Sequence, residues 1–171
     1  IVGSSAGLIP FIEKNYVYRA LMGSNQQRQA VPLVQPQSPI VGTGIESVAA
    51  ENTGQLVIAE DDGEVTKAGA NELVVKYKTG SVSYEPQHFV RSNEGTSINQ
   101  RVVVNTGDKV KKGDALIEGM SIQGGELALG KDLIVAFMPW AGYNFEDAII
   151  ISRKLVEDDT LTSVHNVDYM I

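Results

Sequence analysis

Apolar residues near the start of the chain recur at helical spacing. Over residues 10–23 they stand three and four positions apart with no interior glycine or proline, which predicts a helix with a break near Asn15. Residues 24–30 are good helix formers that extend this helix or start another turn. Three prolines then forbid a continuing helix, so residues 33–40 are expected to be extended or looped before a short helix that ends at Gly54.

From Gln55 the pattern becomes that of short β-strands separated by turn residues. Residues 56–59 and 64–66 flank an acidic turn sequence that ends in glycine, so they are predicted to form a hairpin. Further strands are expected at residues 72–78 and 101–104.

Two Gly-Asp pairs, Gly107-Asp108 and Gly113-Asp114, predict two tight turns. Glycine supplies positive φ in such a turn, and aspartate hydrogen-bonds the neighbouring backbone. The two turns direct Val110 and Leu116 into a common core and leave the lysines between them in water. This pattern is typical of a small all-β sandwich or barrel.

The last third of the chain contains two runs that are apolar at every position, residues 133–138 and 148–151. Runs of this kind predict strands buried on both faces. Ser152 is expected to cap a short helix from residue 153 to about 158, and residues 162–167 are expected to return as a strand.

Composition changes this picture only in part. The chain has 171 residues, 14 Lys and Arg against 21 Asp and Glu, a formal charge of -7 and no cysteine. The charges of residues 1–59 balance, so the whole excess of acid lies in residues 60–171, and an excess of acid argues against nucleic acid as a partner. No apolar run is long enough to cross a bilayer. Because the chain opens on Ile1 without a methionine, it is expected to be a piece of a longer polypeptide.

The residues that suggest chemistry are Glu146 and Asp147, which stand beside an amide and three aromatic residues. Neighbouring residues of a strand point to opposite faces, so the two carboxylates share one site only if the backbone is turned there. They are either a solvated pair at a strand end or two ligands of Mg²⁺ that need further ligands from elsewhere. His88 and His165 stand alone, so nucleophilic catalysis has little support.

The segment around Arg28 is rich in amides and almost free of charge. Such a segment is either a Gln-rich connector, which composition alone favours, or a polar contact surface for another chain or a nucleic acid.

Several motifs read together are more specific than any one of them. In this order and across nearly the whole chain, they resemble the β subunit of bacterial-type, multisubunit DNA-directed RNA polymerase. The three longest matches are Arg19–Pro32, Gly125–Gly130 and Met138–Ala148, with shorter ones at 40–44, 91–93, 98–100 and the two Gly-Asp pairs.

The resemblance implies a mixed, mainly β fold with three parts. Residues 1–54 would be a helical and loop segment of the fork-side active-centre region. Residues 55–118 would be a β sandwich-like portion, and residues 119–171 would be the first half of a double-psi β-barrel.

The resemblance also implies functional roles in DNA-templated RNA synthesis, although a fragment alone would be inactive. Arg19 matches the family arginine that contacts the triphosphate of the incoming nucleotide, and Asn25 and Arg28 match polar residues near the same nucleotide. Glu146 and Asp147 match the acidic pair beside the second Mg²⁺, which arrives with the nucleotide, whereas the β′ subunit holds the first ion. The implied partners are the β′ and α subunits, a sigma factor, template DNA, nascent RNA and nucleoside triphosphates, with no membrane, in the cytoplasm or nucleoid of a bacterium.

One segment departs from the family pattern. Residues 14–18 read Lys-Asn-Tyr-Val-Tyr where the family usually has a His-Asp-Asp-Ala-Asn type of run, so two acidic residues are absent. Residues 51–90 also match only loosely. An alternative remains open, because the paired Gly-Asp turns also resemble biotinyl and lipoyl domains. A barrel-sandwich carrier of that kind needs a modified lysine in a hairpin motif, and neither Met-Lys-Met nor Asp-Lys-Ala occurs here.

Overall fold

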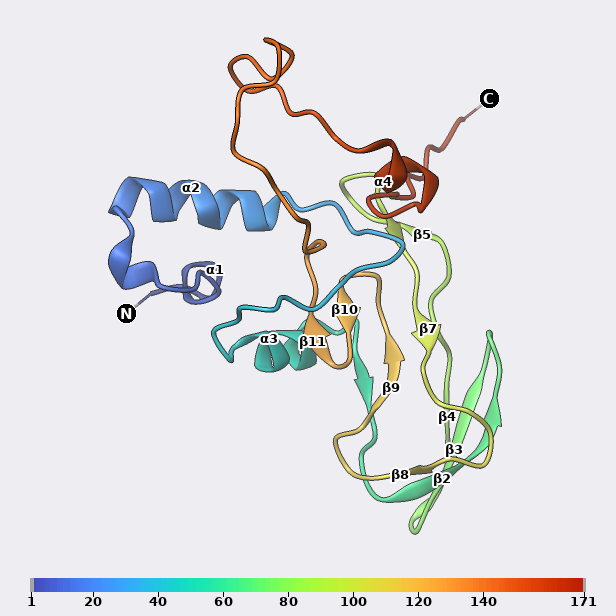
Figure 1. The fold of residues 1–171 in the computed structure, drawn as a ribbon. Helices are drawn as coiled ribbons and strands as arrows, with labels where there is room; N and C mark the ends of the chain where they lie inside the picture. Colours follow the sequence, from blue (N-terminus) through green and yellow to red (C-terminus); the bar gives the residue numbers. More distant parts are fainter. Residues whose placement is uncertain (1, 171) are drawn as a thin grey trace.

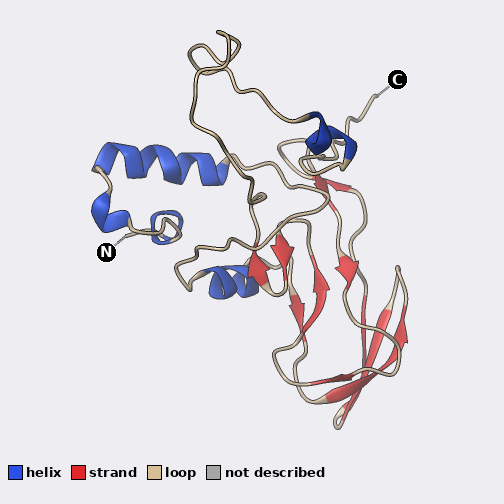
Figure 2. Ribbon diagram, viewed as in Figure 1, coloured by secondary structure: helices blue, strands red, loops and turns tan. Residues whose placement is uncertain are grey.

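The computed structural model describes residues 2–170, and it confirms a mixed, mainly β fold (Figures 1 and 2). Most of its regular structure is short antiparallel strands, and the sheets that these strands form are open. The helical elements are α1 (Ser4–Gly7), the 3₁₀ helix η1 (Ile12–Lys14), α2 (Val17–Arg28), α3 (Glu46–Asn52) and α4 (Arg153–Glu157).

The first predicted helix is present, with the expected interruption. Asn15 is extended, with φ -97° and ψ 149°, and it separates η1 from α2. Helix α2 then runs through the amide-rich segment to Arg28, so residues 24–28 extend the helix. It lies beside α1 in Figure 1, and a Cβ at Gly23 would stand only 3.4 Å from Ile9 Cδ1. Five residues of α2 are half-buried, and the others are exposed: the half-buried ones are Ala20, Gly23, Ser24, Asn25 and Gln27.

The proline-rich segment is not helical, as predicted, and it is bonded to residues 123 and 130. Gln37 forms a β-bridge with Gly130, and Ser38 donates hydrogen bonds to the side chain and the carbonyl of Gln123. The short helix expected before Gly54 is α3, which packs on β11. Between them lies a small apolar cluster of Ala50, Leu56 and Ile122.

In the described part of the chain, residues 2–170, all strand pairs are antiparallel and form four small sheets. The four-stranded sheet has the order β4-β3-β2-β8, the three-stranded sheet has the order β1-β9-β7, and β5-β6 and β10-β11 form two-stranded sheets. The strands are β1 (Val57–Ile58), β2 (Gly63–Ala68), β3 (Leu73–Tyr77), β4 (Gly80–Tyr84), β5 (Val90–Arg91), β6 (Ser97–Ile98), β7 (Arg101–Val102), β8 (Lys109–Val110), β9 (Ala115–Glu118), β10 (Ile122–Gln123) and β11 (Glu126–Leu127).

The main core lies between the four-stranded and the three-stranded sheets. Leu73 and Val75 of β3 are fully buried, and Val110 and Leu116 join them as the two Gly-Asp turns predicted. Burying side chains of this size stabilises the fold by roughly 1.5–3 kcal/mol each. Most of the stabilisation from apolar burial therefore comes from the middle of the chain.

The Gly-Asp turns have the predicted chemistry. Gly107 and Gly113 adopt φ of 93° and 92°. The backbone N–H of Asn105 donates to Asp108 Oδ2 at 2.7 Å, and that of Lys111 donates to Asp114 Oδ2 at 2.8 Å. Each aspartate therefore closes its own turn.

The hairpin predicted for residues 56–59 and 64–66 is wrong. Strand β1 pairs with β9, and β2 pairs with β3 and β8. The acidic turn is held by the second Gly-Asp segment, because Ala59 exchanges backbone hydrogen bonds with Gly113 and Asp114, and Asp62 Oδ1 accepts from the backbone N–H of Lys112. These long-range bonds separate the two strands.

The two buried strands predicted at residues 133–138 and 148–151 are not formed. Both segments are extended and exposed, with Phe137 98% and Ile149 83% exposed, because within residues 2–170 no neighbouring strand pairs with them and no layer covers them. Likewise residues 162–167 contribute only a bridge between His165 and Thr96. The short helix predicted from residue 153 is present as α4, and Ser152 Oγ accepts from the backbone N–H of Lys154 at its start. The double-psi barrel and the three-part division of the chain stay predictions.

Candidate functional site

The predicted nucleotide-contacting residues all lie on α2. Arg19 stands in its first turn and is exposed, and Nη1 makes only a weak contact of 3.6 Å with Met22 Sδ. Near the other end of the helix, the Arg28 guanidinium donates to Asn25 Oδ1. Because an α-helix turns by about 100° per residue, Asn25 and Arg28 share one face and Arg19 lies about 120° around the axis from Asn25. The helix alone therefore presents two separate polar positions.

The predicted acidic pair lies in a projecting loop, residues 138–148, which leaves the β region and returns toward α4 (Figure 1). Three hydrogen-bonded turns form this loop. In the first, the Tyr143 N–H donates to the Trp140 carbonyl at 2.9 Å, and both Ala141 and Gly142 have positive φ. The second overlaps the first, because the Phe145 N–H donates to the Gly142 carbonyl at 3.3 Å. In the third, the Ala148 N–H donates to the Phe145 carbonyl at 3.2 Å across Glu146 and Asp147.

Glu146 has a backbone conformation that side-chain-bearing residues avoid. Its φ is 56°, in the left-handed region, which costs roughly 1–2 kcal/mol for an L-residue other than glycine. The backbone is therefore turned at this point, which meets the condition under which neighbouring carboxylates escape strand alternation. Strained residues of this kind cluster at functional sites. Both Glu146 and Asp147 are exposed, so their carboxylates reach solvent.

Asn144 follows the first turn, and its side chain bonds twice to the backbone at the start of that turn. Its Oδ1 accepts from the Trp140 N–H at 2.9 Å, and its Nδ2 donates to the Met138 carbonyl at 2.7 Å. It is half-buried in a loop that is otherwise exposed. Sequence reasoning counted this amide only as a neighbour of the carboxylates, and its spacing to Trp140 and Met138 was the signal available.

The structure does not bring the two groups of candidates together by direct contact. Across residues 2–170, no hydrogen bond or ion pair joins Arg19, Asn25 or Arg28 to Glu146 or Asp147. In the same part of the chain, no three His, Asp or Glu side chains gather in the way that a complete metal site requires. Two exposed carboxylates are hard oxygen donors that suit Mg²⁺ as part of a ligand set.

Sequence reasoning missed two buried carboxylates that are structural. Glu46 accepts hydrogen bonds from the backbone N–H groups of Thr43 and Gly44, both at 2.7 Å, and the Thr43 bond is the foremost cause of its lowered pKa. Glu118 pairs with Arg101 at 3.1 Å and accepts from the Gly125 N–H at 2.9 Å. Each carboxylate holds a loop.

His88 is not isolated, although the sequence around it suggested that it would be. Its Nε2 lies 2.6 Å from the Ala70 carbonyl oxygen, and its Nδ1 lies 3.0 Å from Asn99 Oδ1. Two oxygen acceptors favour the doubly protonated ring, so the Ala70 bond and then the Asn99 bond raise the pKa of His88. The ring therefore links three segments of the β region.

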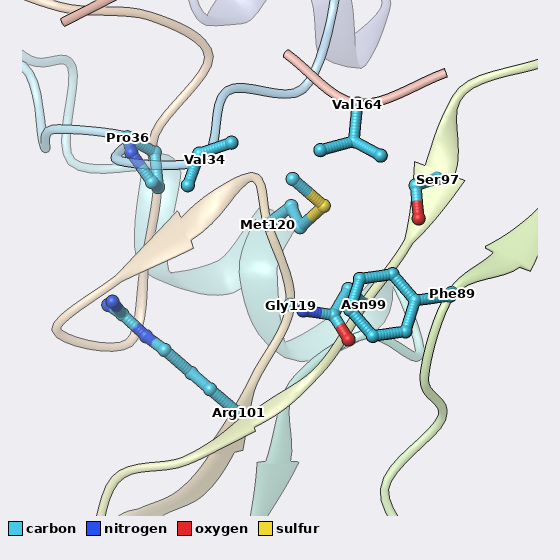
Figure 3. A pocket seen from close by; sticks show the side chains of 9 residues that line it. All are labelled: Val34, Pro36, Phe89, Ser97, Asn99, Arg101, Gly119, Met120 and Val164. Carbon is cyan, nitrogen blue, oxygen red and sulfur yellow. The ribbon is translucent and has the colours of Figure 1, made fainter. Parts of the chain in front are cut away.

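A small cavity of about 240 Å³ lies elsewhere in the molecule (Figure 3). Its walls come from segments far apart in sequence, and Met120 lies between Val34 and Val164 in the view. None of the predicted site residues lines it. Ser97, one of its lining residues, is 2% exposed, and its hydroxyl has no hydrogen-bond partner.

Within residues 2–170, none of the helices is both long enough and apolar enough to span a membrane.

Comparison with known proteins places the chain in a family. The family model described as RNA polymerase Rpb2, domain 6, matches residues 58–171. The DNA-directed RNA polymerase subunit beta of Leifsonia xyli subsp. xyli is 51% identical over 172 residues, which cover 100% of this chain and 15% of that protein. The protein of the same name from Streptococcus sanguinis is 52% identical over 170 residues, which cover 99% of this chain and 14% of that protein.

The chain belongs to the RNA polymerase β-subunit family, and residues 58–171 correspond to Rpb2 domain 6. It spans about 15% of the length of the curated relatives that it matches. The resemblance that the motifs indicated is thereby confirmed.

Proposed function

We propose that this segment takes part in DNA-templated RNA synthesis by contacting the incoming nucleoside triphosphate and by supplying carboxylates to the second Mg²⁺ site. The observation that carries the proposal is identity of 51–52% over essentially the whole chain to RNA polymerase β subunits. The aligned region includes both α2 and the 138–148 loop. The rest of the subunit and the β′ subunit would complete the site.

The exposed guanidinium of Arg19 suits the role of binding phosphate. A guanidinium is planar, keeps its charge at any physiological pH and offers paired N–H donors that match phosphate oxygens. Among residues 2–170, only one of its nitrogens has a hydrogen-bond partner, and that partner is a weakly accepting sulfur. Most of its donors are therefore available to a triphosphate. Asn25 and Arg28, already paired with each other, would contact the same nucleotide from the other end of the helix.

Glu146 and Asp147 would act on the metal side of the reaction. A bound Mg²⁺ neutralises negative charge that develops on phosphate oxygens during transfer. The strained turn at Glu146 exposes two carboxylates next to each other, and exposed carboxylates incur little desolvation cost before they meet a cation. The second ion would arrive with the nucleotide, and the β′ subunit would hold the first.

The wider assignments follow from the same family membership. The intact protein would work with β′, α and sigma subunits on template DNA and nascent RNA, in the cytoplasm or nucleoid of a bacterium. The exposed apolar segments 133–138 and 148–151 would pair within a double-psi barrel that other parts of the subunit complete. The carrier alternative gains no support from the structure or the comparisons, and this segment would be inactive alone.

The test uses polymerase reconstituted with a full-length β subunit that carries Asp147→Ala at the equivalent position. If Asp147 serves the second ion, the Mg²⁺ concentration for half-maximal elongation should rise by about tenfold or more. Asp158→Ala is the matched control, because Asp158 is an exposed aspartate at the end of α4. An unchanged Mg²⁺ titration for Asp147→Ala would refute this role.

A further inference from the structure

The side chain of Asn144 closes the 138–148 loop at its base. It accepts from the Trp140 N–H at 2.9 Å and donates to the Met138 carbonyl at 2.7 Å. One side-chain amide is therefore bonded to the backbone of the residues four and six positions earlier in the chain. Asparagine is the smallest natural side chain that carries a donor and an acceptor on two separate, uncharged groups. Aspartate would lose the donor, and alanine or leucine would lose both.

The two bonds fix the position from which the acidic turn begins. The first turn is held at its centre by the bond from the Tyr143 N–H to the Trp140 carbonyl, and Asn144 adds the bonds that join the turn to Met138 before it. Phe145 follows directly and donates its N–H to the Gly142 carbonyl at 3.3 Å. Asn144 and its neighbours therefore determine the direction in which the chain enters Glu146.

Glu146 needs such support because its conformation is unfavourable. A residue with φ of 56° relaxes to a more common conformation unless the surrounding structure holds it. Within the loop the supporting bonds are those of Asn144 and of the three turns, since the side chains of Phe145, Glu146 and Asp147 are exposed. Loss of the Asn144 bonds would let the turn at Glu146 and Asp147 relax and would change where both carboxylates point.

We propose that Asn144 is a positioning residue, which holds the Glu146–Asp147 turn in the orientation that a divalent cation requires. This inference rests on the proposed function of the carboxylates. The relation is that of an outer-shell partner, which orients a ligand without touching the metal, and removal of such partners typically costs 10–100-fold in metal affinity or activity.

The experiment compares full-length β subunits carrying Asn144→Ala, Asn144→Leu or Asp147→Ala in reconstituted polymerase. Asn144→Leu keeps most of the side-chain volume, so it separates lost hydrogen bonds from lost packing. The control is Asn166→Ala, because Asn166 Nδ2 also donates to a backbone carbonyl, that of Phe89 at 2.7 Å, in a different part of the fold. Assembly of the complex is checked first, and then the Mg²⁺ concentration for half-maximal elongation is measured at saturating nucleotide.

Both Asn144 variants should raise that Mg²⁺ concentration by about tenfold, while assembly is retained and Asn166→Ala has the wild-type requirement. Saturating Mg²⁺ should restore most of the rate, which a general loss of structure would not allow. If Asp147→Ala raises the Mg²⁺ requirement and the Asn144 variants do not, the positioning role is refuted and the proposed function survives. If Asp147→Ala itself has no effect, the proposed function fails, and the positioning role fails with it.

Discussion

The Glu46 carboxylate accepts the backbone N–H of Thr43 at 2.7 Å and so closes the loop that precedes its own helix. Its second oxygen accepts the Gly44 N–H, also at 2.7 Å, and the side chain is 8% exposed. One buried charge thus satisfies two backbone donors.

Glu46→Gln should therefore loosen this loop. Hydrogen bonds to a charged group are worth about 1.5–3 kcal/mol, and the amide keeps only one acceptor oxygen without the charge. We expect the free energy of local opening to fall by about 1–2 kcal/mol, which is roughly a 5- to 30-fold faster exchange of the Thr43 and Gly44 amides. Hydrogen exchange of the intact subunit, followed by mass spectrometry, measures this change in the exchange rate of the two amides. Glu51→Gln, an exposed residue of the same helix, should change the exchange little.

The same carboxylate makes the loop sensitive to acid. The Thr43 and Gly44 N–H groups lower the pKa of Glu46 below its ordinary value of 4.5. A lowered pKa means that the stabilisation is fully present above the unfolded value and is lost as pH falls through the folded value. Protection of the loop, corrected for intrinsic exchange, should therefore decline below about pH 4.5 in the wild type. A pH-independent protection in the wild type over that range would contradict this.

His88 should respond to pH in the opposite sense. Its hydrogen bonds to the Ala70 carbonyl and to Asn99 Oδ1 raise its pKa above the ordinary 6.5. The stabilisation is then complete below pH 6.5 and is lost as pH rises through the raised pKa. Exchange of the imidazole C2 hydrogen, followed by mass spectrometry over a pH series, gives the pKa directly.

Asn99→Ala provides the internal comparison, because it removes one acceptor and leaves the Ala70 bond in place. The pKa of His88 should move back toward 6.5 in that variant. A wild-type value at or below 6.5 would show that the two acceptors do not favour the charged ring.

Local features of this fold could be predicted from sequence, because neighbouring residues determine them. The turns at Gly107 and Gly113 and the Ser152 cap each need only a few consecutive residues, and all three are present. Pairing between distant strands could not be predicted in the same way. Strand β1 leaves its sequence neighbour because Asp62 and Ala59 bond to residues 112–114, and nothing in the local pattern of residues 56–66 indicates that partner.

Some residues of the candidate site could be indicated from sequence and others could not, for a related reason. Motifs drew attention to Arg19 and to Glu146–Asp147, and the condition that the backbone must turn at the carboxylates is met by the φ of Glu146. The exposed state of residues 133–138 was not predicted, because an apolar run indicates burial only when a covering layer is present. Asn144 was overlooked because its two hydrogen bonds to the backbone have no signature in composition.

Gly63 should tolerate no side chain. A Cβ there would lie 2.7 Å from the Lys76 carbonyl oxygen and 2.8 Å from a ring carbon of Tyr77, at the start of β2. Gly63→Ala should destabilise the four-stranded sheet by about 1–3 kcal/mol, the usual cost of overpacking. Faster amide exchange in β2 and β3 of the intact subunit would reveal it. Gly130→Ala is the control, since a Cβ at Gly130 would meet nothing within 4 Å.

Arg19 gives the most direct test of the nucleotide contact. Arg19→Ala in reconstituted polymerase removes the charge-assisted hydrogen bonds that the proposal assigns to the triphosphate. Such bonds are worth about 1.5–3 kcal/mol, so the KM for nucleoside triphosphates should rise roughly 10- to 100-fold. Arg19→Lys should recover only part of this loss, because an ammonium keeps the charge without the planar pair of donors.

The matched control for Arg19 is Arg153→Ala. Arg153 is also an exposed arginine in the first turn of a helix, and its guanidinium pairs with Glu157 at 2.9 Å on the surface. Surface pairs of this kind contribute at most about 1 kcal/mol, so this variant should leave the nucleotide KM unchanged. Equal KM values for Arg19→Ala, Arg153→Ala and the wild type would exclude a triphosphate contact at Arg19. A rise in KM that Arg19→Lys restores completely would instead mean that charge alone matters, and the paired-donor geometry would have to be abandoned.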